Sequence, residues 1–484
     1  MFGPYTVAID VGSSSVRALL FDGEARQMEG FGAQLTYRLR TTPDGGAEID
    51  ANDLLDLTLD CLDEVHRQVQ ANGIEVEAVG GSAFWHSFLG IDATGKPTFP
   101  ILHLLDTRAE PYVDQLPDAH ARTGCMPHAS YWPAKLLWLA EHRKAELAAT
   151  AHLLSFPEYL FLQLFGRARA SLSMVSATGL WNQNTGDYDT QMLAALPIRR
   201  DQLPDPATFD QPESQLRPQF LRDWPCFEKA KWFPALGDGA CNNLGSGCFS
   251  REQASLMVGT TGAMRVVIEA PSIEIPRGLW CYRVDRKRFV LGGALSNGGE
   301  VFAWAKRALQ LPKDQEARLE AAVPGSHQLT VLPFFSGERT PYWRGDLRAA
   351  ITGLSFSTEP FHILQALLEG VSLGFGEIYR LLASQPGTAQ EVIASGGALL
   401  KSPGWTQMMA DALGRPVIAC TEAETSCRGA ALWAMEQAGI IANISDLPAS
   451  TGGVFQPRPE AREQFRRLRD AQSALYEKLF GPRQ

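Results

Sequence analysis

The sequence contains two similar segments that lie about half a chain apart. Residues 7–22 (VAIDVGSSSVRALLFD) and 256–269 (LMVGTTGAMRVVIE) each consist of an apolar run, a turn of glycine and hydroxyl residues, and a second apolar run. This pattern predicts a strand, a tight turn and a returning strand. A repeat at this separation predicts a duplicated domain, in which two facing hairpins would contact a phosphate chain from both sides.

The composition of the two turns favours a phosphate ligand. They read GSSS at 12–15 and GTTG at 259–262. Glycine allows close approach of the backbone, and backbone N–H groups and hydroxyls both bind phosphate oxygens. Either turn alone is equally typical of an ordinary hairpin, so the repeat carries the inference. The sequence has no Walker loop and no Rossmann fingerprint, because Gly95-Lys96 is followed by Pro97 and no GxGxxG opens a helix.

Length, charge and cysteine usage narrow the class of protein. A chain of 484 residues allows two or three domains. The net charge of -10 and the lack of any block of Lys and Arg argue against nucleic acid or an anionic membrane as partner. The eight cysteines form no CxxC pair, which predicts reduced thiols and no zinc site. No apolar run reaches about 18 residues and no basic flank opens the chain, so a cytoplasmic location is expected.

Apolar, strand-like runs alternate with amphipathic stretches along the chain, which predicts α/β domains. Helical spacing is found at 51–72, at 133–150 and in the charged tail at 459–481. A Pro-, Asp- and Gln-rich stretch at 195–225 predicts a long surface connection. A glycine-rich, almost uncharged stretch before the second hairpin predicts a domain junction near residue 250.

Several motifs resemble those of the FGGY carbohydrate kinases, which are members of the actin-like ATPase superfamily. Residues 10–17 (DVGSSSVR) resemble the first phosphate loop of that family, and residues 349–369 resemble its C-terminal signature. Residues 130–142 resemble the N-terminal signature but depart from it at Trp132, where Pro, Ser or Thr is expected. The residues in register there are Lys135, Trp138, Glu141 and His142.

The resemblance runs from about residue 5 to about residue 440. It implies an α/β protein with two duplicated ribonuclease-H-like domains and a cleft between them. The implied N-terminal domain, residues 1–250, would bind the sugar and carry the first phosphate loop. The implied C-terminal domain, residues 251–458, would bind ATP, and an amphipathic helix would occupy 459–484. The resemblance also allows a homodimer.

Two carboxylates are the candidates for metal and proton chemistry. Asp10 ends an apolar strand, where an ionised carboxylate is costly unless it is paired or binds a metal. The resemblance implies that Asp10 binds Mg²⁺ through water; a turn cap is the alternative. Asp238 lies between glycines in ALGDGA, and the resemblance implies that it is the general base. It could equally cap a helix beginning near Ala240, and both roles need an exposed carboxylate at a helix start.

The resemblance also implies contacts to ATP in several segments. Ser13, Ser14 and Arg17 would lie near the transferred phosphoryl group, although an Arg on a strand is also typical of a solvated face. The SGGA run at 395–398 lies between an apolar strand and an expected helix, where its amides could face adenosine or merely form a turn. The full set of expected phosphate and ATP contacts is Gly12, Ser13, Ser14, Arg17, Thr260, Thr261, Gly262, Gly299, Gly396, Gly397 and Ala398.

The acceptor site is expected in two further segments. The expected acceptor contacts are Trp85, His86, Asp106, Arg108 and the base Asp238. His86 with Ser87 resembles gluconate kinases, whereas His103 stands where those kinases usually carry Trp. Arg108 could bind a substrate carboxylate through a bidentate pair. A lone His is more often structural than a ligand, and Arg339 could instead form an interdomain salt bridge.

Together these features predict a cytoplasmic carbohydrate kinase that uses ATP and Mg²⁺. D-Gluconate, converted to 6-phosphogluconate, is the first expected acceptor; D-xylulose or another pentulose or polyol is the second. Two domains would close over ATP and the acceptor. An actin-like nucleotide-switch ATPase is the alternative of a different class, and it would hydrolyse ATP slowly whatever sugar is present. A degenerate kinase kept as a sugar sensor is a further alternative, against which the presence of Asp10 and Asp238 argues.

Overall fold

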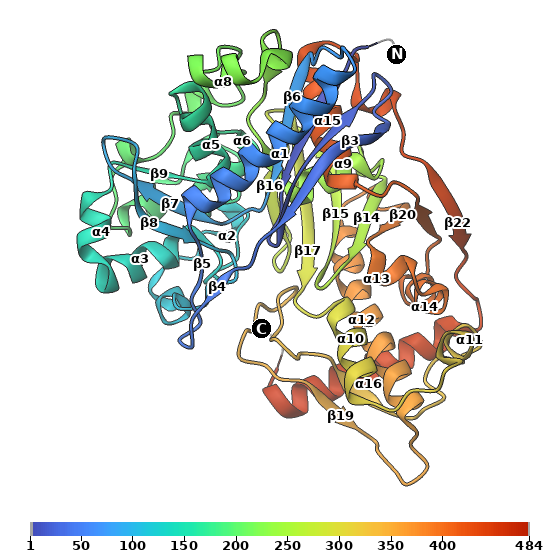
Figure 1. Cartoon of the computed structure of the whole chain (residues 1–484). Helices are drawn as coiled ribbons and strands as arrows, with labels where there is room; N and C mark the ends of the chain where they lie inside the picture. The colour runs from blue at the N-terminus through green and yellow to red at the C-terminus, as the bar shows by residue number, and fades with distance from the viewer. Residues whose placement is uncertain (1–2, 483–484) are drawn as a thin grey trace.

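The computed structural model describes residues 3–482, which form two large sheets with helices packed around them (Figure 1). The first sheet has the strand order β12-β6-β1-β2-β3, with β13 also paired to β6, and the second has the order β16-β17-β15-β14-β20-β21-β22. The strands of the first sheet are β1 (Thr6–Val11), β2 (Ser15–Phe21), β3 (Gln27–Thr36), β6 (Ala78–Ala83), β12 (Lys231–Trp232) and β13 (Leu236–Gly237). Those of the second are β14 (Gln253–Val258), β15 (Gly262–Glu269), β16 (Trp280–Arg283), β17 (Arg288–Leu295), β20 (Glu391–Ser395), β21 (Val417–Cys420) and β22 (Thr451–Phe455).

The two sheets repeat one topology. In the first, the antiparallel hairpin β1–β2 is joined by antiparallel β3 on one side and parallel β6 on the other. In the second, the hairpin β14–β15 is joined by antiparallel β17 and parallel β20 in the same places. The last paired residues are Val11 with Val16, and Val258 with Gly262. The predicted hairpins and the predicted duplication are therefore confirmed.

Sixteen α-helices surround the sheets within the described residues, and most predicted helical stretches are present. Helix α1 covers β2 and β3, and Asp50 caps it by accepting from the amides of Asn52 and Asp53. The helices are α1 (Ala51–Ala71), α2 (His120–Thr123), α3 (Trp132–His142), α4 (Lys144–Ala149), α5 (Phe156–Phe165), α6 (Leu172–Ser176), α7 (Thr190–Ala194), α8 (Pro218–Asp223), α9 (Asp238–Gly245), α10 (Gly299–Ala308), α11 (Gln315–Glu320), α12 (Pro360–Leu382), α13 (Gly397–Leu400), α14 (Pro403–Leu413), α15 (Thr425–Ala438) and α16 (Ala461–Phe480).

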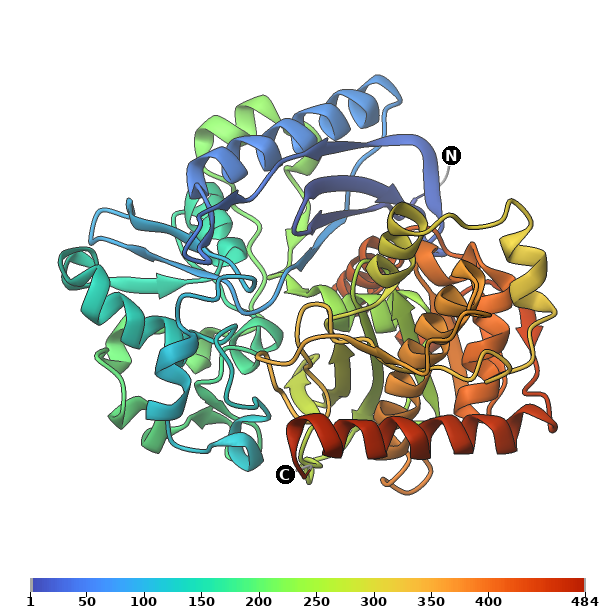
Figure 2. The same cartoon turned by 90° about the horizontal axis from the view of Figure 1, so that it is seen from below.

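Three predicted stretches differ in detail from the structure. The stretch 133–150 is two helices, because Arg143 takes non-helical φ and ψ of -134° and 44° between α3 and α4. The stretch 195–225 holds the short helix α8 and two 3-10 turns, Arg200–Gln202 and Pro206–Thr208. The tail forms α16, which runs along one edge of the second sheet's half of the molecule (Figure 2) and buries Phe465 and Tyr476.

Helices α9 and α15 lie together and join the two sheets. Glycines let them touch: a Cβ on Gly245 would lie 1.7 Å from the carbonyl oxygen of Thr425, and one on Gly429 would lie 1.9 Å from that of Cys241. Helix α15 comes late in the chain, yet Ala430 and Trp433 belong to the same core as the first sheet. The end of the second half therefore packs against the strands that open the chain.

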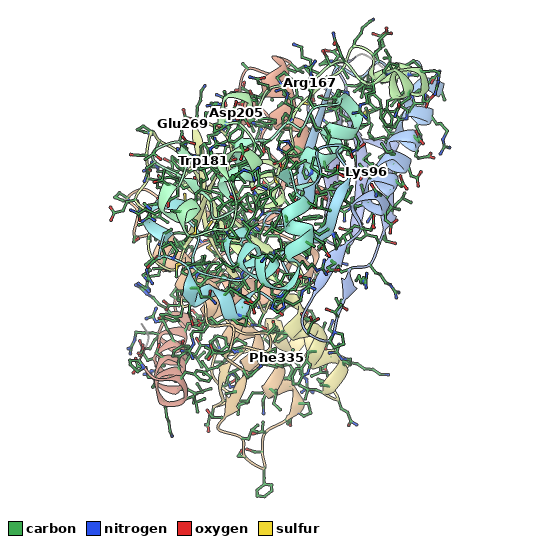
Figure 3. The ribbon with its side chains drawn as sticks, turned by 90° about the vertical axis from the view of Figure 1, so that its left-hand side faces the viewer. Lys96, Arg167, Trp181, Asp205, Glu269 and Phe335 are labelled. Atoms are coloured by element: carbon green, nitrogen blue, oxygen red, sulfur yellow. The ribbon has the colours of Figure 1, made fainter. Side chains whose placement is uncertain are left out.

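A smaller sheet extends the first half. Its order is β4-β5-β8-β7-β9, and its strands are β4 (Arg40–Thr41), β5 (Ala47–Ile49), β7 (Phe88–Ile91), β8 (Pro97–Leu102) and β9 (His152–Leu154). The turn between β7 and β8 carries Lys96, which lies at the outer edge of the molecule and far from Phe335 of the second half (Figure 3). The strand pairs β10 (Trp181–Asn182) with β11 (Asp187–Tyr188) and β18 (Thr330–Leu332) with β19 (Ala350–Thr352) complete the structure. No helix among residues 3–482 is long and apolar enough to cross a membrane.

Candidate active site

Asp10 ends strand β1 directly opposite Arg17 on β2. The Nη1 atom of Arg17 lies 3.7 Å from Oδ2 of Asp10, and Oδ1 of Asp10 is buried without a hydrogen-bond partner. Burial raises the pKa of Asp10 to about 6, while the side chains of Ser82 and Arg17 act in the opposite direction. The structure thus leaves one carboxylate oxygen free for a ligand beside the first turn.

Glu424 was not among the residues predicted from the sequence, although it belongs to the same cluster. It lies at the start of α15, and its Oε2 is 2.7 Å from Nη1 of Arg17. Because Arg17 contacts both acids, the ion pair ties the second half of the chain to the first hairpin. No local sequence signal could reveal a contact across so many residues; it follows from the packing of α15 on the first sheet.

Asp238 is the first residue of α9 and follows Gly237 at the N-cap position. The helix therefore begins at Asp238, not near Ala240 as expected. The indole of Trp85 covers this turn so closely that a Cβ on Gly237 would lie 1.8 Å from it, which excludes any other residue there. Burial raises the pKa of the Asp238 carboxyl, and the nearby Arg265 guanidinium opposes that rise.

The second turn is built around backbone contacts. Thr260 and Thr261 are exposed at its tip. The amide of Gly299 donates to the carbonyl oxygen of Gly259 at 2.8 Å, and the amide of Glu300 donates to that of Thr260 at 3.1 Å. These bonds place the start of α10 against the turn, and a helix N-terminus favours anions.

The SGGA run packs against the same turn. Gly396 has φ of +92°, and a Cβ there would lie 2.5 Å from the carbonyl oxygen of Val258. A Cβ on Gly299 would lie 2.4 Å from the Cβ atom of Ala398. The structure therefore gathers one set of the predicted ATP residues into a single cluster: Thr260, Thr261, Gly262, Gly299, Gly396, Gly397 and Ala398. The exposed Ser13 and Ser14, with Gly12, lie instead beside Asp10 and Arg17 in the first turn.

An aromatic wall extends from Asp238 through the predicted acceptor segment. Trp85 packs edge-on against Tyr282 with ring centroids 5.0 Å apart, and His86 packs against Tyr131 at 4.8 Å. The hydroxyls of Tyr131 and Tyr282 are hydrogen-bonded at 2.6 Å. We define this aromatic wall as Trp85, His86, Tyr131, Tyr282, Trp280 and Trp343.

A positive φ and deep burial distinguish His86 from the other residues of the wall. Its φ is +66°, a conformation that non-glycine residues avoid unless the surroundings enforce it. Its Nδ1 is 2.7 Å from the carbonyl oxygen of Ala177, and burial lowers its pKa to about 3. The ring is therefore neutral near pH 7. Lys135 of the N-terminal signature holds the backbone of this segment. Its Nζ donates to the carbonyl oxygens of His86 and His103 at 3.3 and 2.8 Å.

Asp106 and Arg108 lie in an ion cluster of the first half. The Nε of Arg108 donates to Asp106 Oδ1 at 3.0 Å, and its Nη2 lies 2.7 Å from Glu48 Oε1. Glu48 also pairs with Arg143 at 2.6 Å, and the Arg108 guanidinium lies 4.2 Å from the ring centroid of Trp138. Two carboxylates already pair with the Arg108 guanidinium, which is typical of a structural role. Binding of an acceptor carboxylate by Arg108 stays a prediction.

The donor set around Asp10 suits Mg²⁺ with phosphate and water as its other ligands. A free, buried carboxylate oxygen is the kind of single protein ligand that this ion takes beside a substrate phosphate. Among residues 3–482 no group of three His, Cys, Asp or Glu side chains could hold a metal alone. The residues present fit an ion that arrives together with a nucleotide.

Two family models match the chain. The N-terminal domain of the FGGY family of carbohydrate kinases matches residues 5–245, and its C-terminal domain matches residues 254–438. Together they cover most of the chain, and their boundary falls between α9 and β14.

Curated relatives match over nearly the whole chain. A gluconokinase of Bacillus subtilis is 26% identical over 96% of this chain and 94% of its own length. A glycerol kinase of Acidovorax ebreus is 28% identical over 92% of this chain and 93% of its own. Among solved structures, a gluconate kinase from Lactobacillus acidophilus has a TM-score of 0.90 at 23% identity, covering 98% of each chain. A xylulose kinase from the same organism has a TM-score of 0.91 at 23% identity, covering 99% of each chain.

Proposed function

The chain belongs to the FGGY family of carbohydrate kinases, and from that premise we propose that it transfers the terminal phosphoryl group of ATP to D-gluconate. The product would be 6-phosphogluconate. The observation that carries the proposal is the position of Asp238, which starts α9 beside Trp85 of the aromatic wall and acts electrostatically on Asp10 near the first turn. The curated gluconokinases supply the choice of acceptor, since they match 96% of the chain.

The proposed reaction needs a base for the attacking hydroxyl. Asp238 accepts that proton as the acceptor oxygen bonds to phosphorus. Arg265 opposes the effect of burial on its pKa and so favours the ionised form that a base requires. The wall at Trp85 and His86 holds the carbon chain and excludes water from the hydroxyl.

The two turns hold the donor. Thr260, Thr261 and the start of α10 bind the nucleotide phosphates, and the SGGA cluster lies beside the adenosine. Ser13 and Ser14 offer hydroxyls to the transferred group. Asp10 would hold Mg²⁺ through water, and when bound the ion neutralises charge on the phosphates.

Release of ADP from MgATP tests the proposal across D-gluconate, D-xylulose, D-ribulose, L-ribulose, glycerol and erythritol. We expect a gluconate-dependent rate that is lost in Asp238→Asn. A rate with D-xylulose alone would keep the kinase and replace the acceptor, an outcome that the similar fold of the xylulose kinase makes worth testing. Slow ADP release unaffected by any of these compounds would favour a nucleotide-switch ATPase.

A further inference from the structure

Arg265 on β15 is a buried cation without an acidic partner. Its side chain lies at the junction with α9, and the residue is only 6% exposed. Its one side-chain hydrogen bond reaches Oδ1 of Asn242 at 3.4 Å, while Nε has no partner. Among residues 3–482 it forms no ion pair with a carboxylate. A guanidinium in such a place is costly unless an anion arrives.

Arg339 is a second guanidinium without an acidic partner among the described residues, although the residue is only half-buried. Its Nε is buried without a hydrogen-bond partner, and no ion pair of the described residues includes it. The guanidinium lies 5.4 Å from the ring centroid of Trp343, a residue held at a positive φ of +57°. It therefore belongs to the far end of the aromatic wall.

The wall connects both cations to Asp238. From Arg339 it passes through Trp343 to Tyr131 and His86, with ring centroids 6.4 and 4.8 Å apart. It continues through Tyr282 and Trp85 to the first turn of α9. There a Cβ on Gly239 would lie 3.0 Å from Nε of Arg265.

The electrostatics of these groups agree with the geometry. Burial, with a smaller contribution from the positive charge of Arg339, lowers the pKa of Arg265 to about 10, while Asp238 acts in the opposite direction. The two histidines that face Arg339, His86 and His128, are neutral because burial holds their pKa values at about 3. Within residues 3–482, Asp238 is thus the one carboxylate that acts on Arg265, and the proposed base needs that negative charge for itself.

We propose that Arg265 and Arg339 form a subsite for the carboxylate of a sugar-acid acceptor. The subsite rests on the proposed kinase function and deepens it, because it states which charge on the acceptor the protein selects. A six-carbon sugar acid carries its carboxylate and its terminal hydroxyl at opposite ends. One molecule lying along the wall would place the hydroxyl at Asp238 and the carboxylate toward Arg339, and Arg265 beside Asp238 would add its positive charge.

The subsite replaces the earlier candidate for this role. Arg108 has two carboxylate partners of its own, so binding a third would require breaking an existing pair. Arg265 and Arg339 have no such partner to lose. Guanidinium groups bind carboxylates through two parallel hydrogen bonds, which gives orientation as well as affinity.

Selectivity between an acid and its neutral analogue is the test. D-Glucitol has the carbon chain of D-gluconate with an alcohol in place of the carboxylate. We expect Arg265→Met and Arg339→Met each to raise the dissociation constant of D-gluconate by about 100-fold, and to change that of D-glucitol by less than about threefold. Binding is compared because Arg265 also acts on the pKa of the base Asp238. Arg265→Lys should recover part of the loss because it keeps the charge.

Arg283→Met is the matched control. Arg283 is equally buried on β16 of the same sheet, but its guanidinium donates to the carbonyl oxygens of Gln183 and Arg286. Its loss should lower stability while leaving the ratio of gluconate to glucitol affinity unchanged. Equal losses for both ligands in Arg265→Met and Arg339→Met would overturn the subsite and leave the kinase intact. A wild-type enzyme that phosphorylates only neutral acceptors would also overturn it, whereas no phosphorylation of any acceptor would reject the proposed function itself.

Discussion

The two hairpins share a backbone but carry different chemistry. In the first, the next-to-last pair of the register is Asp10 with Arg17; in the second, the corresponding pair is Met257 with Ala263. Charge is therefore concentrated at the first turn. At the second turn the contacts are made by glycines and backbone amides, as at Gly299.

This difference separates two tasks that phosphoryl transfer requires. Charged groups that titrate or bind a metal must be few and well placed, because each is costly when buried. Phosphate oxygens can instead be held by neutral amides and hydroxyls at a turn and a helix start. On the proposed function, the duplicated fold supplies two turns for phosphate, and only the first has a pair of charged residues beside it.

The largest effect should come from Asp238, the proposed general base. Asp238→Asn should lower kcat by about 10²- to 10⁴-fold, because the amide cannot accept the proton. Steady-state ADP release with saturating acceptor measures this. Asp210→Asn is a matched control, since burial raises the pKa of Asp210 to about 6 and its carboxylate accepts from the amide of Leu172 in the first half of the chain; a comparable loss there would show that any carboxylate with a raised pKa matters equally.

The next largest effect should be confined to the second hairpin. Gly299→Ala places a methyl group 2.5 Å from the carbonyl oxygen of Gly259 and should displace the start of α10. We expect KM for ATP to rise by about tenfold or more, as an overpacked contact costs about 1–3 kcal/mol. KM for the acceptor should not change. Gly453→Ala, which has open space around it, should change neither constant.

Asp10 gives the first hairpin a pH dependence that the second lacks. Its pKa is about 6 in the fold against 3.8 for the free side chain. The unfolded chain therefore ionises first, and Asp10 lowers stability progressively between about pH 4 and pH 6, with the full cost above that range. Asp10→Asn removes the cost and should stabilise the protein by about 3 kcal/mol at pH 8, and very little at pH 4.

Urea unfolding of both proteins at the two pH values measures this difference. Equal stabilisation at pH 4 and pH 8 would contradict it. Addition of MgATP should stabilise the wild type more than Asp10→Asn, because the variant lacks the free carboxylate.

The smallest effect should come from the ion pair that joins α15 to the first hairpin. Arg17 and Glu424 have side chains that are 29% and 30% exposed, so solvent screens their attraction. Glu424→Gln should lower the free energy of unfolding by less than about 1 kcal/mol. A loss of several kcal/mol would mean that the pair, and not apolar packing around Trp433, holds α15 on the first sheet.

Local patterns predicted the parts of the site that depend on neighbours in sequence. Both turns, the strand before Asp10 and the glycine-flanked Asp238 could be found this way, because a strand, a turn and a helix start are set by short-range periodicity and backbone preference. The sequence predicted a helix beginning near Ala240, whereas α9 begins at Asp238 with Gly237 as its N-cap. Only the ring of Trp85 above it explains why that glycine forms the cap.

The sequence by itself determined the duplicated hairpins, the family and the residue types available for catalysis. The tertiary structure alone decided which charges meet. In the folded chain Arg17 pairs with Glu424, and Arg108 pairs with Glu48 and Asp106. Arg265 and Arg339 form no ion pair with a carboxylate of the described residues. The physical reason is that the energy of a charge depends on its burial and on its neighbours in space, and both are fixed only when distant segments pack together.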